Sequence, residues 1–339
     1  MKSTLKQIYN LAGVPAQPLK LGYMHKLGQI RTDETVMLQA QFLQKELPVR
    51  LAGRVRDLDN LPYGLAYQSP VKTVRNLYVD SFNRIHNFIP IKSNIDVKNF
   101  TDMLQDIKTI HHDVPQDLAL GIEELKNETD ADLYHSEYNE PVDHFLNKFY
   151  LCRIGIRTLI DLHIQSYDQD PNPLIKTQKA KEIFDNVVDE LHSIAMNERI
   201  DPIPEIIYKN PKDLLITYIP SHIHFAILEV LKNAVNATVR TGSCEPVTCE
   251  IFETKDDTVI KICDKGGGFS REDIGSAFSY LYTTSSEKSA LSGYGHGLPL
   301  ARLYTRYFGG DLLLIPYKGI GTNVIIYFSK ISYGTEVIC

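Results

Sequence analysis

Helical periodicity dominates the first half of the chain. Four successive segments carry apolar residues every three or four positions, the spacing that gathers them on one face of a helix. These stripes are Leu43, Leu47, Leu51 and Val55; Val71, Val74, Tyr78, Phe82 and Ile85; Val97, Phe100, Leu104 and Ile107; and Phe145, Phe149, Cys152, Ile156 and Leu159. Four amphipathic helices in series predict an antiparallel four-helix bundle.

Local signals refine these helices. Thr32, followed by two acidic residues, is a favourable N-cap for the first helix, and Pro48 predicts a kink inside it. The second helix follows Pro70. The apolar spacing lets the third helix continue past Pro115 as far as Leu125.

The pattern changes after a polar stretch with two prolines, 168–173. A helix is expected at 180–197. Short apolar runs then predict strands at 214–218, 248–253, 259–264, 312–315 and 323–328, and helical spacing appears at 222–239, 272–281 and 298–308. One sheet covered by helices, a two-layer α/β sandwich, accounts for this alternation. We therefore expect an α+β protein with a helical domain at 1–168, a linker at 169–178, an α/β domain at 179–332 and a short tail at 333–339.

Composition narrows the class of protein. A chain of 339 residues suits two domains, and 43% apolar with 23% charged residues suits an ordinary folded core. A net charge of −6 argues against non-specific nucleic-acid binding. No apolar run approaches the roughly 20 residues of a membrane span. The five cysteines lack zinc-site spacing, which favours reduced thiols and an intracellular or organellar location.

Two glycine-rich loops suggest a nucleotide site. Asp264 follows an apolar strand and leads into Gly266, Gly267 and Gly268, so a carboxylate able to accept a hydrogen bond from an adenine amine sits at a turn that needs glycine. The second loop, 293–297, opens a helix with Pro299 in its first turn. Such a junction presents backbone N–H groups and the positive end of the helix to phosphate.

A helix face and a late strand complete the set. Glu229 and Asn233 lie four residues apart on one face, where Asn233 can offer an oxygen to Mg²⁺ and Glu229 can orient or deprotonate a nucleophile. Thr322 places a hydroxyl at the start of the last strand. Each feature alone has an ordinary structural explanation, a tight turn, a loop or a solvated side chain, but their order and spacing together form a strong signal.

These four blocks resemble the N, G1, G2 and Gly-Thr boxes of the GHKL ATPases, which include Hsp90, DNA gyrase B, MutL and histidine kinases. More specifically, segments 280–284, 293–304 and 307–312 look like the mitochondrial pyruvate dehydrogenase kinases. The resemblance extends from about Thr4 to Lys330. It implies an N-terminal four-helix bundle, a C-terminal GHKL (Bergerat) α/β sandwich with a mixed sheet, and a serine kinase that uses Mg·ATP to phosphorylate and inactivate the E1α subunit of the pyruvate dehydrogenase complex.

The resemblance also implies residue roles. Glu229 would be the general base, Asn233 the Mg²⁺ ligand and Asp264 the adenine acceptor. The implied nucleotide-binding residues are Glu229, Lys232, Asn233, Asn236, Asp264, Gly266, Gly268, Thr283, Thr284, Gly293, Tyr294, Gly295, His296, Gly297, Leu298 and Thr322. Segment 283–295 would be a mobile lid over the nucleotide.

In the bundle, a group of residues resembles the family's pyruvate and dichloroacetate pocket: Tyr78, Ser81, Lys108, His111, Arg153 and Arg157. On pattern alone these residues are more simply core polar groups or bundle ion pairs. Lys108 stands where the family has Arg. Because Lys lacks the bidentate fork that binds a carboxylate, the case for inhibition by pyruvate is weakened.

The chain also departs from the family at other positions. Phe225 replaces a His one turn before Glu229, and Asn236 replaces an Arg; His222 lies near the face of Glu229 and is an alternative tuning group or base. The chain contains no Trp, and the family's long C-terminal tail is absent, which puts tail-assisted docking to lipoyl domains of the E2 core in question. A homodimer through the sheet domains remains expected. The resemblance and an N-terminal segment without Asp or Glu together predict the mitochondrial matrix.

Alternative functions stay open. A branched-chain 2-oxoacid dehydrogenase kinase is the nearest. A histidine autokinase is more distant, because His112, Asp113 and Pro115 only faintly resemble a phosphoacceptor box and no receiver region accompanies them. A non-catalytic, ATP-binding scaffold on the dehydrogenase complex is a further possibility.

Overall fold

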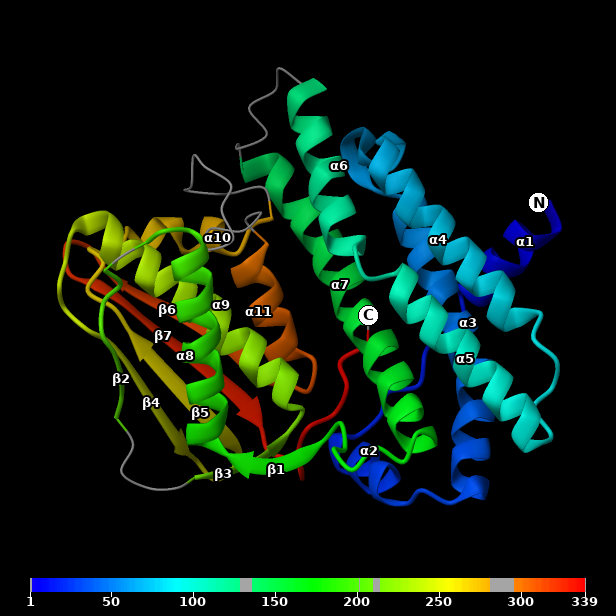
Figure 1. Cartoon of the computed structure of the whole chain (residues 1–339). Helices are drawn as coiled ribbons and strands as arrows, with labels where there is room; N and C mark the ends of the chain where they lie inside the picture. Colours follow the sequence, from blue (N-terminus) through cyan, green and yellow to red (C-terminus); the bar gives the residue numbers. More distant parts are fainter. Residues whose placement is uncertain (1, 129–135, 201, 210–213, 281–295, 339) are drawn as a thin grey trace. The chain divides into compact units, whose positions relative to one another are not determined.

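The computed structural model describes residues 2–128, 136–200, 202–209, 214–280 and 296–338 (Figure 1). The chain divides into two compact units. The first comprises Met1–Leu19, Tyr23–Leu174 and Ile338–Cys339, and the second comprises Lys20–Gly22 and Ile175–Val337. The fold is α+β, with helices forming the first half of the chain and a mixed sheet in the second.

The first half of the chain is helical. Its helices are α1 (Lys2–Leu11), α2 (Leu21–Gln29), α3 (Asp33–Asp59), α4 (Ser69–His86), α5 (Asn94–Ile110), α6 (Val114–Glu128) and α7 (Ser136–Tyr167), with a 3₁₀ segment, η1 (Pro62–Tyr67). Helix α3 packs against α4, α5 and α7. The apolar stripes predicted on the first three helices are buried, so their periodicity identifies the core of this unit correctly.

Two local predictions for these helices have different outcomes. The Thr32 hydroxyl accepts a hydrogen bond from the Thr35 N–H at 3.2 Å, as expected of an N-cap, and α3 runs through Pro48 without a break. The predicted continuation of the third helix is wrong, because α5 ends at Ile110 and α6 begins at Val114. Pro115 therefore lies in the first turn of α6, where its missing N–H is tolerated; inside a continuous helix it would remove a hydrogen bond.

The second unit is built on a five-stranded sheet. Its elements are β1 (Lys176–Lys179), α8 (Ala180–Asn197), β2 (Ile206–Tyr208), β3 (Leu215–Tyr218), α9 (Pro220–Thr241), β4 (Val247–Glu253), β5 (Asp257–Cys263), η2 (Arg271–Asp273), α10 (Ile274–Ala277), α11 (Gly297–Arg306), β6 (Asp311–Tyr317) and β7 (Gly321–Ser329). The strand order is β2-β4-β5-β7-β6. Since β2 pairs with β4 in parallel and all other neighbours are antiparallel, the sheet is mixed.

The structure corrects the predicted sheet in two respects. The run at 214–218 was expected in the main sheet, but β3 pairs with β1 in a separate two-stranded sheet. Strands β1 and β2 were not predicted, because they are short and lack a clear apolar alternation. The helix expected at 272–281 is also shorter: η2 leads into α10, which ends at Ala277, and Gly275 within it is a poor helix former.

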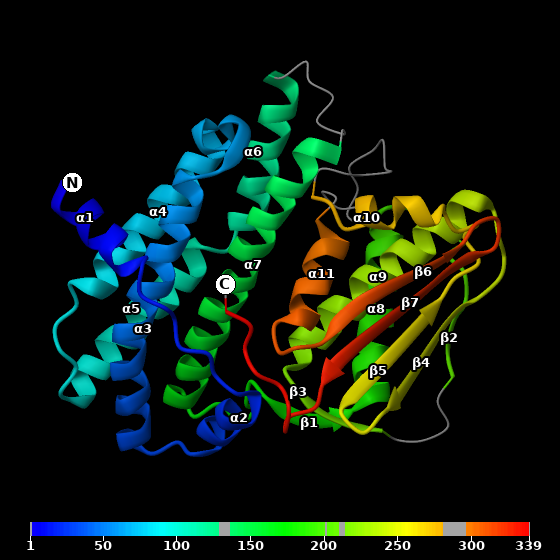
Figure 2. The same cartoon turned by 180° about the vertical axis from the view of Figure 1, so that it is seen from behind.

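Helices α8, α9 and α11 lie on one face of the sheet, and Figure 2 shows the strands in front of α8 and α9. Alternate side chains of the central strands face these helices and are fully buried, among them Ile260 and Ile326. On the other face, Phe252 and Leu313 are each about two-fifths exposed, so among the described residues this face is partly open.

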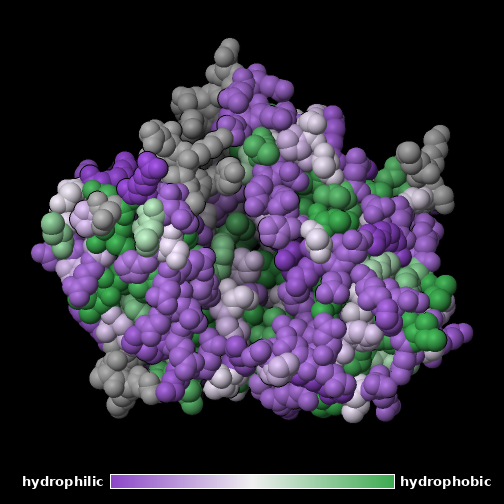
Figure 3. Space-filling view, viewed as in Figure 1, coloured by the Kyte–Doolittle hydropathy of each residue, from purple (hydrophilic) through white to green (hydrophobic). Residues whose placement is uncertain are grey.

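The face of the molecule in Figure 3 is largely hydrophilic, with hydrophobic residues scattered over it. None of the described helices combines the length and the apolar composition that crossing a membrane requires.

Candidate functional site

A cavity of about 510 Å³ opens in the second unit between α9, the loop after β5, the start of α11 and strands β6 and β7. It brings together nine of the predicted nucleotide-site residues: Glu229, Asn233, Asn236, Asp264, Gly266, Gly268, Gly297, Leu298 and Thr322. The α9 members are spaced four and three residues apart, so the helix presents all of them to the cavity on one face.

Asp264 lines the cavity at the end where Gly266 packs against Ala237, and it is buried, with 7% of its surface exposed. Its Oδ1 accepts hydrogen bonds from the N–H groups of Gly266 at 2.8 Å and Thr322 at 3.1 Å. Burial raises the pKa of this carboxyl, while the two N–H groups act in the opposite direction. Within the described part of the chain Oδ2 receives no hydrogen bond, so it can accept one from a ligand amine.

The glycines after Asp264 are required by close packing and backbone conformation. A Cβ at Gly266 would lie 2.5 Å from the Cβ of Ala237 on α9. Gly267 and Gly268 have φ angles of 80° and 58°, in the left-handed region that favours glycine. A Cβ at Gly268 would also collide with the carbonyl oxygen of Tyr317. The loop can therefore bring its backbone close to both α9 and the β6–β7 turn.

Glu229 lies at the other end of the cavity, against the first residue of α11. A Cβ at Gly297 would collide with Oε2 of Glu229 and stand 3.0 Å from its Cδ. The Lys232 ammonium lies 2.7 Å from Oε1, and both side chains are nearly buried. Lys232, predicted to contact nucleotide, does not line the cavity; it contacts the carboxylate of Glu229 instead.

Asn233 projects from α9 into the cavity one turn after Glu229 and is exposed there. Across the described residues, no group of three or more His, Cys, Asp or Glu side chains could hold a metal ion. An amide oxygen beside a carboxylate nevertheless fits Mg²⁺, which usually takes only one or two protein ligands and completes its shell with phosphates and water.

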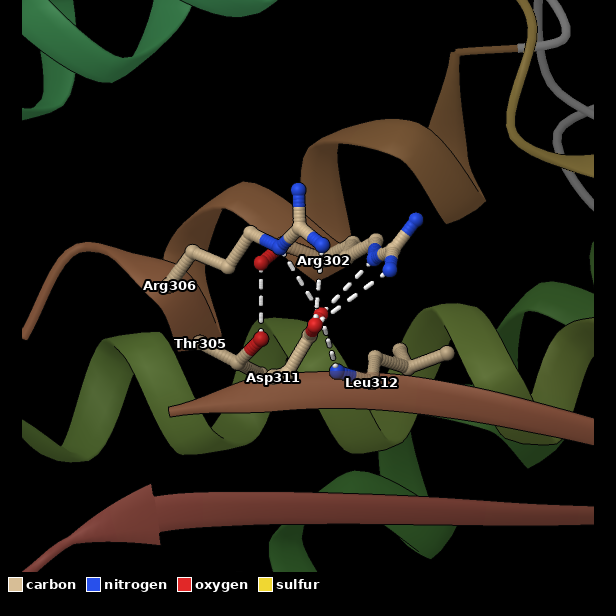
Figure 4. Close-up of polar contacts among 5 residues, drawn as sticks. All are labelled: Arg302, Thr305, Arg306, Asp311 and Leu312. Carbon is tan, nitrogen blue, oxygen red and sulfur yellow. Dashed lines mark hydrogen bonds and ion pairs between the residues drawn. The ribbon is translucent and has the colours of Figure 1, made fainter. Parts of the chain in front are cut away.

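Helix α11 is tied to β6 by a carboxylate between two guanidinium groups (Figure 4). Asp311 Oδ1 accepts hydrogen bonds from Nε of Arg302 at 2.7 Å and of Arg306 at 2.9 Å, and also from the Leu312 N–H at 2.8 Å. Burial raises the pKa of Asp311, but these donors outweigh it and lower the pKa to about 2. Sequence reasoning missed this cluster, which fixes the helix whose first residue contacts Glu229.

The remaining predicted nucleotide residues do not all reach the site. His296 is buried and its ring packs edge-on against Tyr280 at 5.1 Å between centroids, outside the cavity lining. The other predicted contacts, Thr283, Thr284, Gly293, Tyr294 and Gly295, lie outside the described residues, as does the proposed lid at 283–295.

His222 does not line the cavity, although it was considered as an alternative base. Its ring is packed against Tyr304 at 4.8 Å and Tyr307 at 5.9 Å between centroids. Burial lowers its pKa to about 3, so the ring is neutral near pH 7. Phe225, which stands where relatives place a His, also packs on Tyr304, at 4.8 Å between centroids.

Several lining residues were not predicted: Arg240, Thr241, Phe269, Asp273 and Ala277. The helical period contained part of this information, because Arg240 lies eleven residues after Glu229 on the same face of α9. Phe269, Asp273 and Ala277 belong to the segment after the glycine loop. The sequence of that segment has no periodic pattern that would predict which of its residues line the cavity.

A second, much smaller cavity of about 10 Å³ lies within the helical unit. Its lining includes Tyr78, Lys108, His111, Arg153 and Arg157, and the Ser81 hydroxyl lies 2.8 Å from Nε2 of His111. All six residues predicted for the bundle pocket are thus neighbours. The space is near the minimum for a single water molecule.

Polar groups of this bundle cavity are already engaged by the protein. Arg153 donates a hydrogen bond to the His111 carbonyl at 2.7 Å, and the Lys108 ammonium lies 2.5 Å from Oδ1 of Asp161. Burial, reinforced by the nearby Arg153 charge, lowers the pKa of His111 to about 4. Burial also raises the pKa of Tyr78 to about 12. Both groups are therefore neutral near pH 7.

Comparisons with known proteins agree with this architecture. Residues 18–189 match the family model described as mitochondrial branched-chain alpha-ketoacid dehydrogenase kinase, and residues 219–331 match that of the histidine kinase-, DNA gyrase B- and HSP90-like ATPase. A mitochondrial [pyruvate dehydrogenase (acetyl-transferring)] kinase of Arabidopsis thaliana is 33% identical over 99% of this chain and 96% of its own. The mitochondrial [pyruvate dehydrogenase (acetyl-transferring)] kinase isozyme 4 of Homo sapiens is 34% identical over 86% of this chain and 76% of its own. The mitochondrial [pyruvate dehydrogenase (acetyl-transferring)] kinase of Drosophila melanogaster is 30% identical over 98% of this chain and 86% of its own.

The sequence identity extends over nearly the whole chain, and the two family models match the ATPase region and the region before it. The chain therefore belongs to the family of mitochondrial pyruvate dehydrogenase kinases and branched-chain alpha-ketoacid dehydrogenase kinases, which are ATP-dependent protein kinases of the GHKL class.

Proposed function

We propose that this protein is a mitochondrial matrix serine kinase that transfers the γ-phosphoryl group of Mg·ATP to the E1α subunit of the pyruvate dehydrogenase complex, and thereby inactivates that complex. The observation that supports the proposal is the cavity lined by Glu229, Asn233 and Asp264. Glu229 adjoins Gly297 at the start of α11, and the glycine loop after Asp264 adjoins Ala237, two turns further along α9. The relatives' names supply the substrate.

In this proposal each end of the cavity has a separate task. Asp264 Oδ2 accepts a hydrogen bond from the adenine amine, with Thr322 beside it. The start of α11 at Gly297 presents its positive end to the phosphates. Asn233 would hold Mg²⁺, which when bound neutralises charge on the phosphate oxygens.

Glu229 acts on the substrate. Its carboxylate takes the proton of the serine hydroxyl as the oxygen bonds to the γ-phosphorus and the bond from that phosphorus to the bridging oxygen of ADP breaks. Lys232 at 2.7 Å and Gly297 fix the carboxylate in place, so the base is oriented before substrate binds.

The partners follow from the same assignment. The E1α subunit is the substrate and the lipoyl domain of the E2 core is the docking partner. We further propose a homodimer formed through the open face of the sheet. Phe252 and Leu313 are exposed apolar residues on that face, and a second copy would bury them.

A branched-chain dehydrogenase kinase is the second candidate, because the family model matching 18–189 carries that description. A single labelling experiment tests both. The protein is incubated with γ-labelled Mg·ATP and either complex, and the label is followed through acid treatment. We expect acid-stable phosphoserine on pyruvate dehydrogenase E1α. Label mainly on the branched-chain subunit would replace the substrate.

The same experiment tests a histidine autokinase. Acid-labile label confined to this chain would contradict the serine kinase. His111 is a poor phosphoacceptor, since it is buried and hydrogen-bonded to Ser81. His112 is exposed but pairs with Asp113 at 2.7 Å. Absence of transfer to either complex, with ATP binding retained, would support the non-catalytic scaffold.

A further inference from the structure

Among the described residues that line the cavity, acidic side chains outnumber basic ones. Three carboxylates line it, those of Glu229, Asp264 and Asp273. Arg240 is the only cationic side chain among the lining residues that the structure describes. From the described lining a triphosphate therefore meets one guanidinium group, together with the metal ion that it brings and the positive end of α11.

Arg240 contributes to the cavity lining from α9. It lies on the cavity face of α9, one turn after Asn236. Side chains on a helix lean toward its N-terminus, so a long side chain covers the turn before its own Cα. Ala237 and Thr241, which flank Arg240, adjoin the glycine loop after Asp264, so Arg240 begins at that end of the cavity. Its side chain is long enough to reach over the turn of Asn236 toward the Glu229 end.

The guanidinium group of Arg240 is available to a ligand. The side chain is exposed, and it makes no hydrogen bond or ion pair with any residue for which the structure gives a position. By contrast, the nearby Lys232 ammonium is paired with Glu229 at 2.7 Å. Asn236, one turn before Arg240 in the cavity lining, is shorter and carries no charge.

We propose that Arg240 is a side-chain binding group for the polyphosphate chain of ATP, and that it contributes to a preference of this cavity for charged nucleotides over nucleosides. A guanidinium group presents several N–H donors in a planar fork that matches phosphate oxygens. The inference rests on the proposed ATP site and adds to it a residue outside the predicted set.

The test is calorimetric titration of ATP, ADP and adenosine into the full-length protein and its Arg240→Gln variant. We expect Arg240→Gln to weaken ATP binding roughly tenfold, the scale of a lost charged hydrogen bond at a partly exposed site. ADP should weaken by a similar or smaller factor, and adenosine by less than about twofold, because it lacks the phosphates. Lys255→Gln removes an equal charge from an exposed turn and should leave all three affinities unchanged.

Salt supplies an independent readout. The ATP affinities of wild type and Arg240→Gln should converge as ionic strength rises, because screening weakens an exposed charge contact. An unchanged ATP affinity in Arg240→Gln would overturn the proposal. Equal losses for ATP and adenosine would also overturn it, because Arg240 would then act on the base, the ribose or the fold. If wild-type protein bound neither ligand, the ATP site itself would be refuted, which is a different failure.

Discussion

The carboxylate of Glu229 lies directly against the Cα of Gly297, so that any side chain at position 297 would occupy the space of Oε2. The two residues are 68 positions apart and come from different helices, α9 and α11. Lys232 holds the other oxygen of the same carboxylate at 2.7 Å. The proposed base is thus confined between a lysine of its own helix and the first turn of another.

This contact predicts the effect of a single methyl group. Gly297→Ala should displace the Glu229 carboxylate and lower turnover by at least tenfold, because a misplaced base loses alignment with the hydroxyl proton. Gly275→Ala is the matched control, since nothing lies within 4 Å of a Cβ there. Steady-state kinetics on both variants check the prediction. Equal activity of the two would show that the position of Glu229 is unimportant.

Chemical removal of the base should separate turnover from binding. Glu229→Gln keeps the size of the side chain but cannot accept the proton, so turnover should fall by about 10²–10⁴ while ATP affinity stays within a few-fold. Asn233→Ala should instead abolish Mg²⁺-dependent ATP binding, because it removes the metal's protein oxygen. Wild-type turnover in Glu229→Gln would support the scaffold function or another base.

The adenine end has its own test. Asp264→Ala removes a buried carboxylate acceptor, so ATP and adenosine should both bind tens-fold more weakly, on the order of 2–3 kcal/mol. The exposed turn residue Asp256 provides a control, and Asp256→Ala should change neither affinity. Calorimetry measures both, with thermal unfolding as the check on folding. An Asp264→Ala protein that is folded and binds ATP normally would refute the assignment of this loop.

The bundle cavity is predicted to bind small carboxylates weakly. Its free volume of about 10 Å³ means that pyruvate or dichloroacetate must displace side chains to enter, so we expect millimolar or weaker affinity. Lys108→Arg should tighten binding by supplying a bidentate donor, while Lys98→Arg, at an exposed ion pair, should not. NMR titration observes this directly. If neither ligand shifts bundle resonances in any variant, the six polar residues are core groups only.

The cluster at Asp311 predicts a pH-dependent contribution to stability. Its pKa is about 2 in the folded protein and near 4 in an unfolded chain. The carboxylate therefore stabilises the fold above about pH 4, and the contribution is lost as the pH falls toward 2.

Asp311→Asn should lower the free energy of unfolding by about 1–2 kcal/mol at pH 7 and at pH 5, and by less at pH 3. Urea unfolding at the three pH values, with Asp256→Asn as control, measures this difference. A deficit that is as large at pH 3 as at pH 7 would show that the Arg302 and Arg306 contacts do not depend on the charge of Asp311.

The local pattern of the sequence was sufficient to predict many of the helices and part of the candidate site. The stripes at Leu43–Val55 and Val71–Ile85 predicted buried helix faces, because a helix repeats every 3.6 residues whatever surrounds it. The spacing of Glu229, Asn233 and Asn236 likewise placed them on one face of α9. The glycines after Asp264 were informative because positive φ angles and close backbone contacts both exclude a Cβ.

Tertiary structure alone decided the rest. Three features come from contacts between segments far apart or between different elements, so the local sequence pattern does not predict them. They are the pairing of β3 with β1, the burial of His222 against Tyr304 and Tyr307, and the hydrogen bonds from Arg302 and Arg306 to Asp311. Sequence spacing put His222 near the face of Glu229, yet α11 packs over it and buries it away from the cavity. A helical period specifies which direction a side chain faces; what it meets there depends on elements folded in from far along the chain.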